Sequence, residues 1–396
     1  MQSIYHFDEC IDRRGTGCFK WDNPNSVGKL PMHVADMDFA VAPAITRAIA
    51  RRAQHPVYGY TQIMPEYYDS VCGWQKRRHG WTVERDWVIP VIGVLPIVAA
   101  ALRALCGEDR TVMVQPPVYD CFYHCIERNH CRFVCNDLVL DRRAHTWSVD
   151  LDDFERTMVR EHVGVFVLCH PHNPVGRVWT RAELEGMAEM CIRHDVVVIS
   201  DEIHSDILMP GHRHIPFASL DPEVAARTIT CTSPSKPFNM AGLQIANACI
   251  SNPALRARVM EEIFASNAWI VNPFGVVALM AAYDESEAWL DACNAYIYEN
   301  YRYFDTFVRE QMPGYALSPL EGTYLAWLDI AQSGMSSEEL YDILSRETGL
   351  KPCVGANYGA PGRDFLRFNL ALPKSRLVDG CRRLCSVVRR IGGHDA

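Results

Sequence analysis

The feature that most constrains the fold is a regular alternation of helical and β-rich segments between about residues 44 and 284. Apolar residues recur at helical spacing in three stretches, AITRAIARRAQ, PIVAAALRAL and RAELEGMAEMCIRH. Around and between them lie six short β-rich runs, TVMVQ, CRFVC, VGVFVL, VVVIS, RTITC and NACIS. Such alternation is typical of a mostly parallel sheet with helices on both faces. The sequence therefore predicts an α/β domain whose ligand-binding groups lie at the carboxyl ends of the strands.

Two other segments flank this region. Residues 1–43 contain Pro24, Gly28 and Pro31 and show little periodicity, so we expect an N-terminal arm that packs on the C-terminal part of the molecule. After residue 284 a long helical stretch is followed by the strand-like runs GTYLAWLDI and DFLRFNLAL. The sequence therefore predicts a large domain over residues 44–284 and a smaller α+β domain over residues 285–396. A chain of 396 residues is long enough for both.

Charge and hydropathy argue against nucleic acid and membrane partners. Acidic residues outnumber basic ones, 48 to 39, and no Lys/Arg-rich run interleaved with aromatic residues is present. The longest apolar run, residues 87–102, is too short to span a bilayer comfortably and contains Pro90, Gly93 and Pro96. The N-terminal residues MQSIYHFDEC do not have the pattern of a signal peptide. We therefore expect a cytoplasmic protein with a small-molecule partner, whose 16 cysteines are reduced thiols.

Two clusters raise the possibility of a metal site. Cysteines with spacings of four occur in CFYHCIERNHCRFVC, at Cys121, Cys125, Cys131 and Cys135. Structural zinc sites more often use CxxC spacing. A group of histidines also occurs, at His170, His172, His204, His212 and His214. This group contains no HExxH-type pair. We therefore expect no metal.

Polar residues follow several of the predicted strands. Asn173 follows VGVFVL, Asp201 follows VVVIS, and Lys236 follows RTITC. Gly93 precedes a predicted helix whose first amides could bind an anion. Taken singly, each residue has an ordinary explanation as a turn, a helix cap or a loop. Together they suggest one phosphorylated ligand, and a buried lysine is costly unless its charge is used or suppressed.

In this combination and order, the motifs resemble those of the pyridoxal-phosphate enzymes of fold type I, the class I/II aminotransferase superfamily. The matching motifs are NPxG at residues 173–176, the DE pair at 201–202, SxSK at 233–236, and Arg367 in FLRFNL. The resemblance covers nearly the whole chain. It implies the cofactor pyridoxal 5′-phosphate and an amino-acid substrate.

The resemblance also implies a role for each matching residue. Lys236 would bind the cofactor aldehyde and act as the base at the substrate Cα. Asp201 would hold the proton of the pyridine nitrogen, and Asn173 would donate to the phenolic oxygen. Tyr119 would stack on the ring. The phosphate would be held by amides and hydroxyls of Val94, Leu95, Ser233 and Ser235.

Three further residues complete the implied site. Arg367 would bind the substrate carboxylate in a bidentate manner, together with Ala35. Tyr60 resembles a tyrosine that reaches the phosphate from the neighbouring subunit, which implies a homodimer whose partner also contacts the N-terminal arm. For Tyr60 and Tyr119 an ordinary role as core aromatics is an equally good explanation.

Three departures from the usual aminotransferase pattern indicate a branch. The arm contains HVADMDF, the strand motif DEIHSDI has His204 where a tyrosine is frequent, and Gln244 stands where an arginine is frequent. These features resemble the MalY/PatB-type cystathionine β-lyases. That branch implies β-elimination of a thiol from L-cystathionine or related cysteine S-conjugates, which yields pyruvate and ammonia. His204 would then contact the phenolic side of the cofactor.

Two alternatives remain open from the sequence. An aminotransferase acting on an L-amino acid shares the deprotonation at Cα with a lyase, and only the fate of the carbanion differs. A catalytically silent regulatory protein could keep the same fold. The presence of Lys236 together with Asp201 argues against the silent protein, because a binding module needs neither group.

Overall fold

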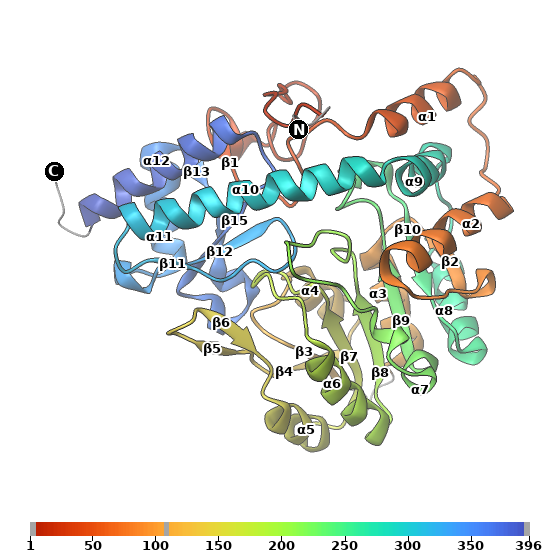
Figure 1. Cartoon of the computed structure of the whole chain (residues 1–396). Coiled ribbons are helices and arrows are strands. Elements are labelled where there is room, and N and C mark those ends of the chain that lie inside the picture. The colour runs from red at the N-terminus through yellow and green to blue at the C-terminus, as the bar shows by residue number, and fades with distance from the viewer. Residues whose placement is uncertain (1–4, 107–110, 392–396) are drawn as a thin grey trace.

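The main sheet of the molecule is mostly parallel, as the alternating sequence predicts. The computed structural model describes residues 5–106 and 111–391. In this part of the chain the largest sheet has seven strands, which are drawn in Figure 1. In spatial order they are β2 (Val88–Val91), β10 (Ala246–Cys249), β9 (Thr228–Thr232), β8 (Val197–Asp201), β7 (Val163–Cys169), β3 (Thr111–Val114) and β4 (Arg132–Cys135). Strand β10 is antiparallel to both neighbours, and the other pairs are parallel.

Helices cover both faces of this sheet because its strands are apolar on both sides. Along β7, Val165 and Val167 belong to one core, while Phe166 and Leu168 belong to another. This alternation follows from the two-residue period of a strand. The first core includes residues of α3 (Val94–Leu105), α4 (Cys121–Arg128) and α8 (Pro253–Ala265). The second includes residues of α5 (Leu151–Arg160) and α6 (Arg181–Arg193).

Strand β2 was not among the six predicted runs. It contains Pro90, which breaks the pattern of a strand. The structure places β2 at the edge of the sheet, where it pairs only with β10. An edge strand tolerates proline because one side of its backbone has no partner strand.

A second, antiparallel sheet lies in the C-terminal part. Its order is β11 (Ala316–Leu317), β12 (Leu325–Asp329), β15 (Phe365–Asn369) and β14 (Cys353–Val354). The predicted long helix corresponds to α10 (Glu287–Gln311), which runs from α9 (Pro273–Glu285) toward α11 (Ser337–Ile343) in Figure 1. The last helix, α12 (Lys374–Ile391), packs on α10. The fold is therefore that of an α/β domain joined to a smaller α+β part.

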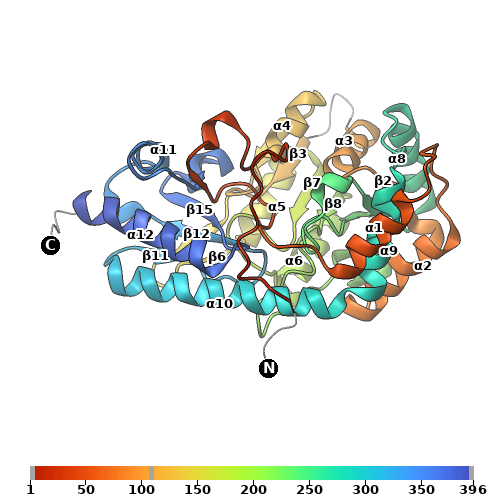
Figure 2. The same cartoon turned by 90° about the horizontal axis from the view of Figure 1, so that it is seen from above.

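The N-terminal residues contact both parts of the molecule. Strand β1 (Leu30–Pro31) pairs in parallel with β13 (Leu350–Lys351), and α1 (Pro43–Ala53) packs on α9. Figure 2 shows the N-terminal segment lying across the top of the molecule between these contacts. The remaining elements are α2 (Pro65–Trp74), α7 (Pro222–Ala226) and the hairpin of β5 (Val139–Asp141) and β6 (Thr146–Ser148). Among the helices of the described residues, none combines the length and apolarity that a bilayer crossing requires.

The central strand β8 provides a test of how far the sheet core stabilises the molecule. Ile199 is fully buried between the sheet and the α3 layer. We expect Ile199→Ala to lower the free energy of unfolding by about 2–5 kcal/mol, because the lost methyl groups leave a cavity. Urea unfolding followed by circular dichroism measures this change. Val139→Ala is the matched control, since Val139 is 49% exposed. Equal effects of the two substitutions would contradict the assignment of Ile199 to the core.

Candidate active site

The register of three parallel strands brings the predicted polar residues to one edge of the sheet. Cys169 at the end of β7 is opposite Asp201 at the end of β8, and Asp201 is opposite Cys231 in β9. Asn173 follows Cys169 by four residues and Lys236 follows Cys231 by five. Residues that are far apart in the chain therefore come together where the strands end, as parallel sheets require.

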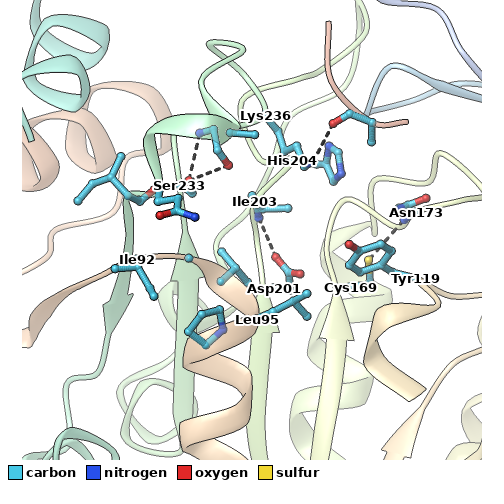
Figure 3. A pocket seen from close by; sticks show the side chains of 18 residues that line it. Ile92, Leu95, Tyr119, Cys169, Asn173, Asp201, Ile203, His204, Ser233 and Lys236 are labelled. Atoms are coloured by element: carbon cyan, nitrogen blue, oxygen red, sulfur yellow. Dashed lines mark hydrogen bonds between the residues drawn. The ribbon is translucent and has the colours of Figure 1, made fainter. Parts of the chain in front are cut away.

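These residues line a cavity of about 250 Å³, close to the lower limit of small-molecule sites, which is roughly 300 Å³. Figure 3 shows side chains from separate elements around the same space. The predicted residues on its wall are Ala35, Val94, Leu95, Tyr119, Asn173, Asp201, His204, Ser233, Ser235 and Lys236. Arg367 is not on the wall but contacts one of its members. Tyr60 lies outside the cavity and is 94% exposed.

Lys236 reaches into the cavity from the loop that follows β9. Its Nζ donates to the carbonyl oxygen of Ala35 at 2.7 Å. No salt bridge of Lys236 with a carboxylate occurs within 4.0 Å among the residues that the structure describes. Burial lowers the pKa of the Lys236 amine below its ordinary value. The lowered pKa increases the fraction of neutral amine, which is the nucleophilic and basic form.

Asp201 is a buried carboxylate with few partners. It is 5% exposed, and the backbone N–H of Ile203 donates to its Oδ1 at 3.1 Å. Burial raises the pKa of Asp201 to about 7, and the nearby Lys236 opposes this rise. A cationic N–H group in the cavity would stabilise the ionised carboxylate. The site is therefore suited to a ring nitrogen that carries a proton.

Asn173 connects the cavity to Arg367 on β15. Its Oδ1 accepts from Nη1 of Arg367 at 2.9 Å, so its Nδ2 is left to donate elsewhere. The Nη2 group of Arg367 donates to the carbonyl of His33 at 2.8 Å, while its Nε is buried without a hydrogen-bond partner among the described residues. The guanidinium group packs on the ring of Tyr358, with Cζ 4.9 Å from the ring centroid. Arg367 is thus held in place with its Nε still available to donate.

The other end of the cavity offers neutral donors. Helix α3 begins after Gly93 without a side-chain cap, so its first amides are available to an anion. The hydroxyl of Ser233 lies 2.9 Å from that of Ser235 and 2.7 Å from the carbonyl of Ile245. Gln244 lines the cavity with a positive φ of 49°. Since Gln244 replaces the arginine that is frequent in the resembling family, amides and hydroxyls must provide most of the anion binding.

Some residues on the cavity wall were not predicted as site residues. Ile203 lies two residues after Asp201, and Cys169 lies opposite Asp201 in the sheet. Ile203 could have been found from its place inside the DEI motif. Cys169 could not, because its position depends on the pairing of β7 with β8. His204 was predicted, and its buried Nδ1 has no hydrogen-bond partner in the described part of the chain.

A buried polar network supports the strand end that carries Asp201. Glu202 accepts from the hydroxyl of Ser200, the amide of Phe217 and the ring of His214, at 2.8, 3.0 and 2.8 Å. Asp206 accepts from His79 at 2.9 Å. Buried carboxylates are stabilised by such bonds, so Glu202 and Asp206 hold the DEIHSDI motif in place against its neighbours. His214 and His79 thus belong to a structural network.

Metal ligands do not gather in the structure. In residues 5–106 and 111–391 no group of three or more His, Cys, Asp or Glu side chains could hold a metal ion. Cys121, Cys125, Cys131 and Cys135 are thiols that form no disulfide. Burial raises the pKa of the Cys125 and Cys135 thiols to about 11. These thiols are therefore protonated and poor metal ligands at neutral pH.

The cavity residues fit pyridoxal 5′-phosphate on three structural observations. Lys236 places an amine with a lowered pKa in the cavity. Among the described residues, the buried carboxylate of Asp201 has no cationic hydrogen-bond partner, and Nδ1 of His204 has no hydrogen-bond partner. An aldehyde, a protonated ring nitrogen and a phenolic oxygen would satisfy these groups in turn. The uncapped start of α3 suits the phosphate.

Known proteins similar to this chain include some named cystathionine beta-lyase and others named transaminase or aminotransferase. The family model described as "Aminotransferase class I and II" matches residues 27–384. "Cystathionine beta-lyase PatB" of Bacillus subtilis (strain 168) is 37% identical over 383 residues, which cover 96% of this chain and 98% of that protein. "Protein MalY" of Escherichia coli (strain K12) is 31% identical over 395 residues, with coverages of 98% and 100%. The crystal structure of cystalysin from Treponema denticola, which contains a pyridoxal 5′-phosphate cofactor, has a TM-score of 0.94 and 32% identity, covering 98% of this chain and 100% of that chain.

The raised pKa of Asp201 predicts how the stability of the cofactor-free protein depends on pH. With a pKa of about 7 when folded and 3.8 when unfolded, Asp201 keeps its proton in the folded state between about pH 4 and pH 7. The folded state then binds more protons than the unfolded state, so the free energy of unfolding falls as the pH rises through this window. We expect Asp201→Asn to remove that fall and to be more stable than the parent protein by about 2–4 kcal/mol above pH 7.

Urea unfolding of both cofactor-free proteins from pH 4 to pH 8 measures this difference. The gap should close toward pH 4, where both side chains are neutral. Asp195→Asn is the matched control, because the Asp195 side chain is 89% exposed. A gap that is constant over the whole pH range would show that Asp201 does not titrate in this window.

Proposed function

The chain belongs to the class I and II aminotransferase family, and we propose that within this family it is a pyridoxal 5′-phosphate-dependent carbon–sulfur β-lyase. Its substrates are L-cystathionine or related cysteine S-conjugates, and its products are a thiol, pyruvate and ammonia. The observation that carries this proposal is that the amine of Lys236, the carboxylate of Asp201 and the amide of Asn173 line one cavity. The identity of 37% to a protein named cystathionine β-lyase supports the reaction type.

When bound, pyridoxal 5′-phosphate supplies an aldehyde that bonds to an amine and a pyridine ring that withdraws electrons from the substrate Cα. Lys236 would supply the amine to which the cofactor aldehyde bonds. Lys236 would also be the base that takes the proton from the substrate Cα, and its lowered pKa favours the neutral form that a base needs. Asp201 would hold the proton on the ring nitrogen, which would keep the ring electron-withdrawing. His204 and Asn173 would bind the phenolic oxygen.

The substrate carboxylate is bound by Arg367. Its buried Nε has no hydrogen-bond partner among the described residues, and a carboxylate oxygen would satisfy it. Ala35 is on the cavity wall next to Lys236, and its backbone adds to this subsite. Arg367 would thus hold the carboxylate end of the substrate beside the cavity that Lys236 lines.

Two rival functions are less well supported than the lyase. An aminotransferase would use the same residues, but HVADMDF and DEIHSDI favour the lyase branch. A silent regulatory protein would keep Lys236 and Asp201 in the cavity without using them. Each is destabilising when buried and unpaired, which makes the silent protein the poorer explanation.

We also propose a homodimer in which Tyr60 reaches the phosphate of the partner subunit. Tyr60 is 94% exposed, and Val57, Tyr58 and Met64 beside it are also more than half exposed. Such an apolar patch is typical of an interface. The same proposal includes an arm of residues 1–43, a large domain of residues 44–284 and a small domain of residues 285–396. The 16 cysteines support a cytoplasmic location, since thiols stay reduced there.

The proposed reaction predicts thiol release without a keto acid. With L-cystathionine alone, we expect pyruvate and free thiol in equal amounts. We expect Lys236→Ala to lower this rate by roughly 10²–10⁴-fold or more, because the base is lost. Borohydride treatment should attach the cofactor to Lys236, which peptide mass spectrometry detects. Lys29→Ala is the matched control, since Lys29 bonds to Ser345 away from the cavity.

The outcomes separate the rivals of this proposal. Activity that appears only after a keto acid is added would favour the aminotransferase. Protein that never retains the cofactor would favour the silent regulatory protein.

The proposed dimer predicts complementation between two inactive variants. Lys236→Ala and Tyr60→Ala should each have low activity as homodimers. If Tyr60 acts across the interface, a mixed dimer of the two has one intact site. Refolding an equal mixture should then restore about a quarter of the parent activity, since half of the dimers are mixed. Absence of any recovery, with mixed dimers shown by native mass spectrometry, would place Tyr60 within its own subunit or outside the site.

A further inference from the structure

Residues 33–39, which we call the bridge segment, lie between the loop of Lys236 and strand β15 of Arg367. The segment has the sequence HVADMDF and contains no helix or strand. Its backbone groups are nevertheless extensively hydrogen-bonded to both neighbours. Polar backbone that lies inside a protein must find such partners, so these bonds determine where the segment sits.

Asn239 binds the bridge segment from the side of the catalytic lysine. It lies three residues after Lys236, and its Oδ1 accepts from the N–H of Met37 at 2.9 Å. Its Nδ2 donates to the carbonyls of Met37 and Phe39 at 3.1 and 2.8 Å. Asn239 has a positive φ of 55°, a conformation that asparagine adopts more readily than most residues.

Asn369 binds the same segment from the side of Arg367. It lies two residues after Arg367 on β15 and is 1% exposed. Its Nδ2 donates to the carbonyls of Val34 and Asp36 at 2.7 and 2.6 Å. Its backbone N–H donates to Met32 at 2.8 Å. The two asparagines therefore hold adjacent stretches of one segment, Asn369 up to residue 36 and Asn239 from residue 37 onward.

Within and next to the stretch that Asn369 holds, the bridge segment touches both cationic residues of the site. The carbonyl of Ala35 accepts from Nζ of Lys236 at 2.7 Å and from the hydroxyl of Tyr324 at 2.8 Å. The carbonyl of His33 accepts from Nη2 of Arg367 at 2.8 Å. A shift of this segment would change the surroundings of the amine and of the guanidinium together.

A buried ionic cluster anchors the segment independently of the asparagines. Arg13 bonds to both carboxylate oxygens of Asp36 and to Asp38, and Lys20 lies 3.4 and 3.2 Å from the same two carboxylates. Lys20 and Asp38 are each 1% exposed. Since buried ions are retained when they are paired, this cluster keeps the segment attached when a single asparagine is lost.

We propose that Asn239 and Asn369 are positioning residues, which set the placement of Lys236 and Arg367 relative to each other through the bridge segment. Neither asparagine lines the cavity. Each acts through the backbone of residues 33–39. The role of Arg367 toward the substrate carboxylate rests on the proposed function, whereas the hydrogen bonds of the bridge segment do not.

The test uses the holoenzyme of the parent chain, Asn239→Gly and Asn369→Asp. Glycine keeps the positive φ of residue 239 while removing the three side-chain bonds. Aspartate at position 369 keeps the size but removes both donated bonds. Asn252→Gly is the matched control, because Asn252 also makes three side-chain bonds but caps α8 away from the cavity. Asn239→Asp replaces Asn239→Gly if the glycine variant does not fold.

Three measurements are compared. Amide hydrogen exchange of peptides that cover residues 33–39 should be faster in both variants and unchanged in the control. Glycine is titrated against the holoenzyme while the absorbance of the bound cofactor is recorded. We expect the half-saturating glycine concentration to rise about tenfold in both variants, because the carboxylate subsite is displaced. The pH midpoint of the cofactor absorbance should move by about 0.5 unit or more, because the Ala35 carbonyl and the neighbouring groups around the nitrogen of Lys236 are displaced.

Unchanged hydrogen exchange of residues 33–39 in both variants would show that the two asparagines do not hold the bridge segment in place, and would overturn the proposal. A second outcome would overturn the positioning role. In that outcome the exchange is faster, but the half-saturating glycine concentration stays within about twofold of the parent value and the pH midpoint within about 0.2 unit, which is roughly the scatter of such measurements. Hydrogen exchange and cofactor absorbance are both independent of carbon–sulfur cleavage. If the parent chain cleaved no cysteine conjugate, the proposed reaction would fail while exchange and absorbance still decided this inference.

Discussion

The parallel register of β7, β8 and β9 is the constraint on which the rest of the site depends. Because Cys169, Asp201 and Cys231 are aligned across three strands, the residues that follow them leave the sheet at one edge. Neither helix packing nor loop sequence could produce this convergence without that alignment. The buried apolar alternation along β7 holds the register, since a slip of one residue would exchange its two cores.

The cavity at this edge contains charges that the protein itself does not neutralise. Asp201 has one backbone hydrogen bond and Lys236 has one carbonyl acceptor, and burial shifts the pKa of each toward its neutral form. A cofactor that brings a cationic ring nitrogen and an electrophilic aldehyde relieves both. Asp201 would then keep the ring electron-withdrawing, and Lys236 would be the base. Binding and catalysis therefore use one set of unsatisfied interactions.

Part of the site comes from residues that no strand end of the large sheet could provide. The bridge segment precedes the sheet by some fifty residues in the chain, and Arg367 lies on the other, antiparallel sheet. Hydrogen bonds from Asn239 and Asn369 bring these parts together. The lysine and the arginine are thus linked through backbone carbonyls of a segment without regular structure.

The sequence by itself located part of the secondary structure and the residues expected to carry the chemistry. Apolar periodicity located six strands of the large sheet and the long helix, because local side-chain spacing reports which faces are buried. Motifs after the strands identified Lys236, Asp201 and Asn173. Strand β2 was missed because Pro90 obscures the pattern, and only its edge position makes proline acceptable. Only the tertiary structure decided that Cys169 lines the cavity and that Asn239 and Asn369 hold residues 33–39, since these contacts join residues up to 335 positions apart and no local pattern encodes such pairing.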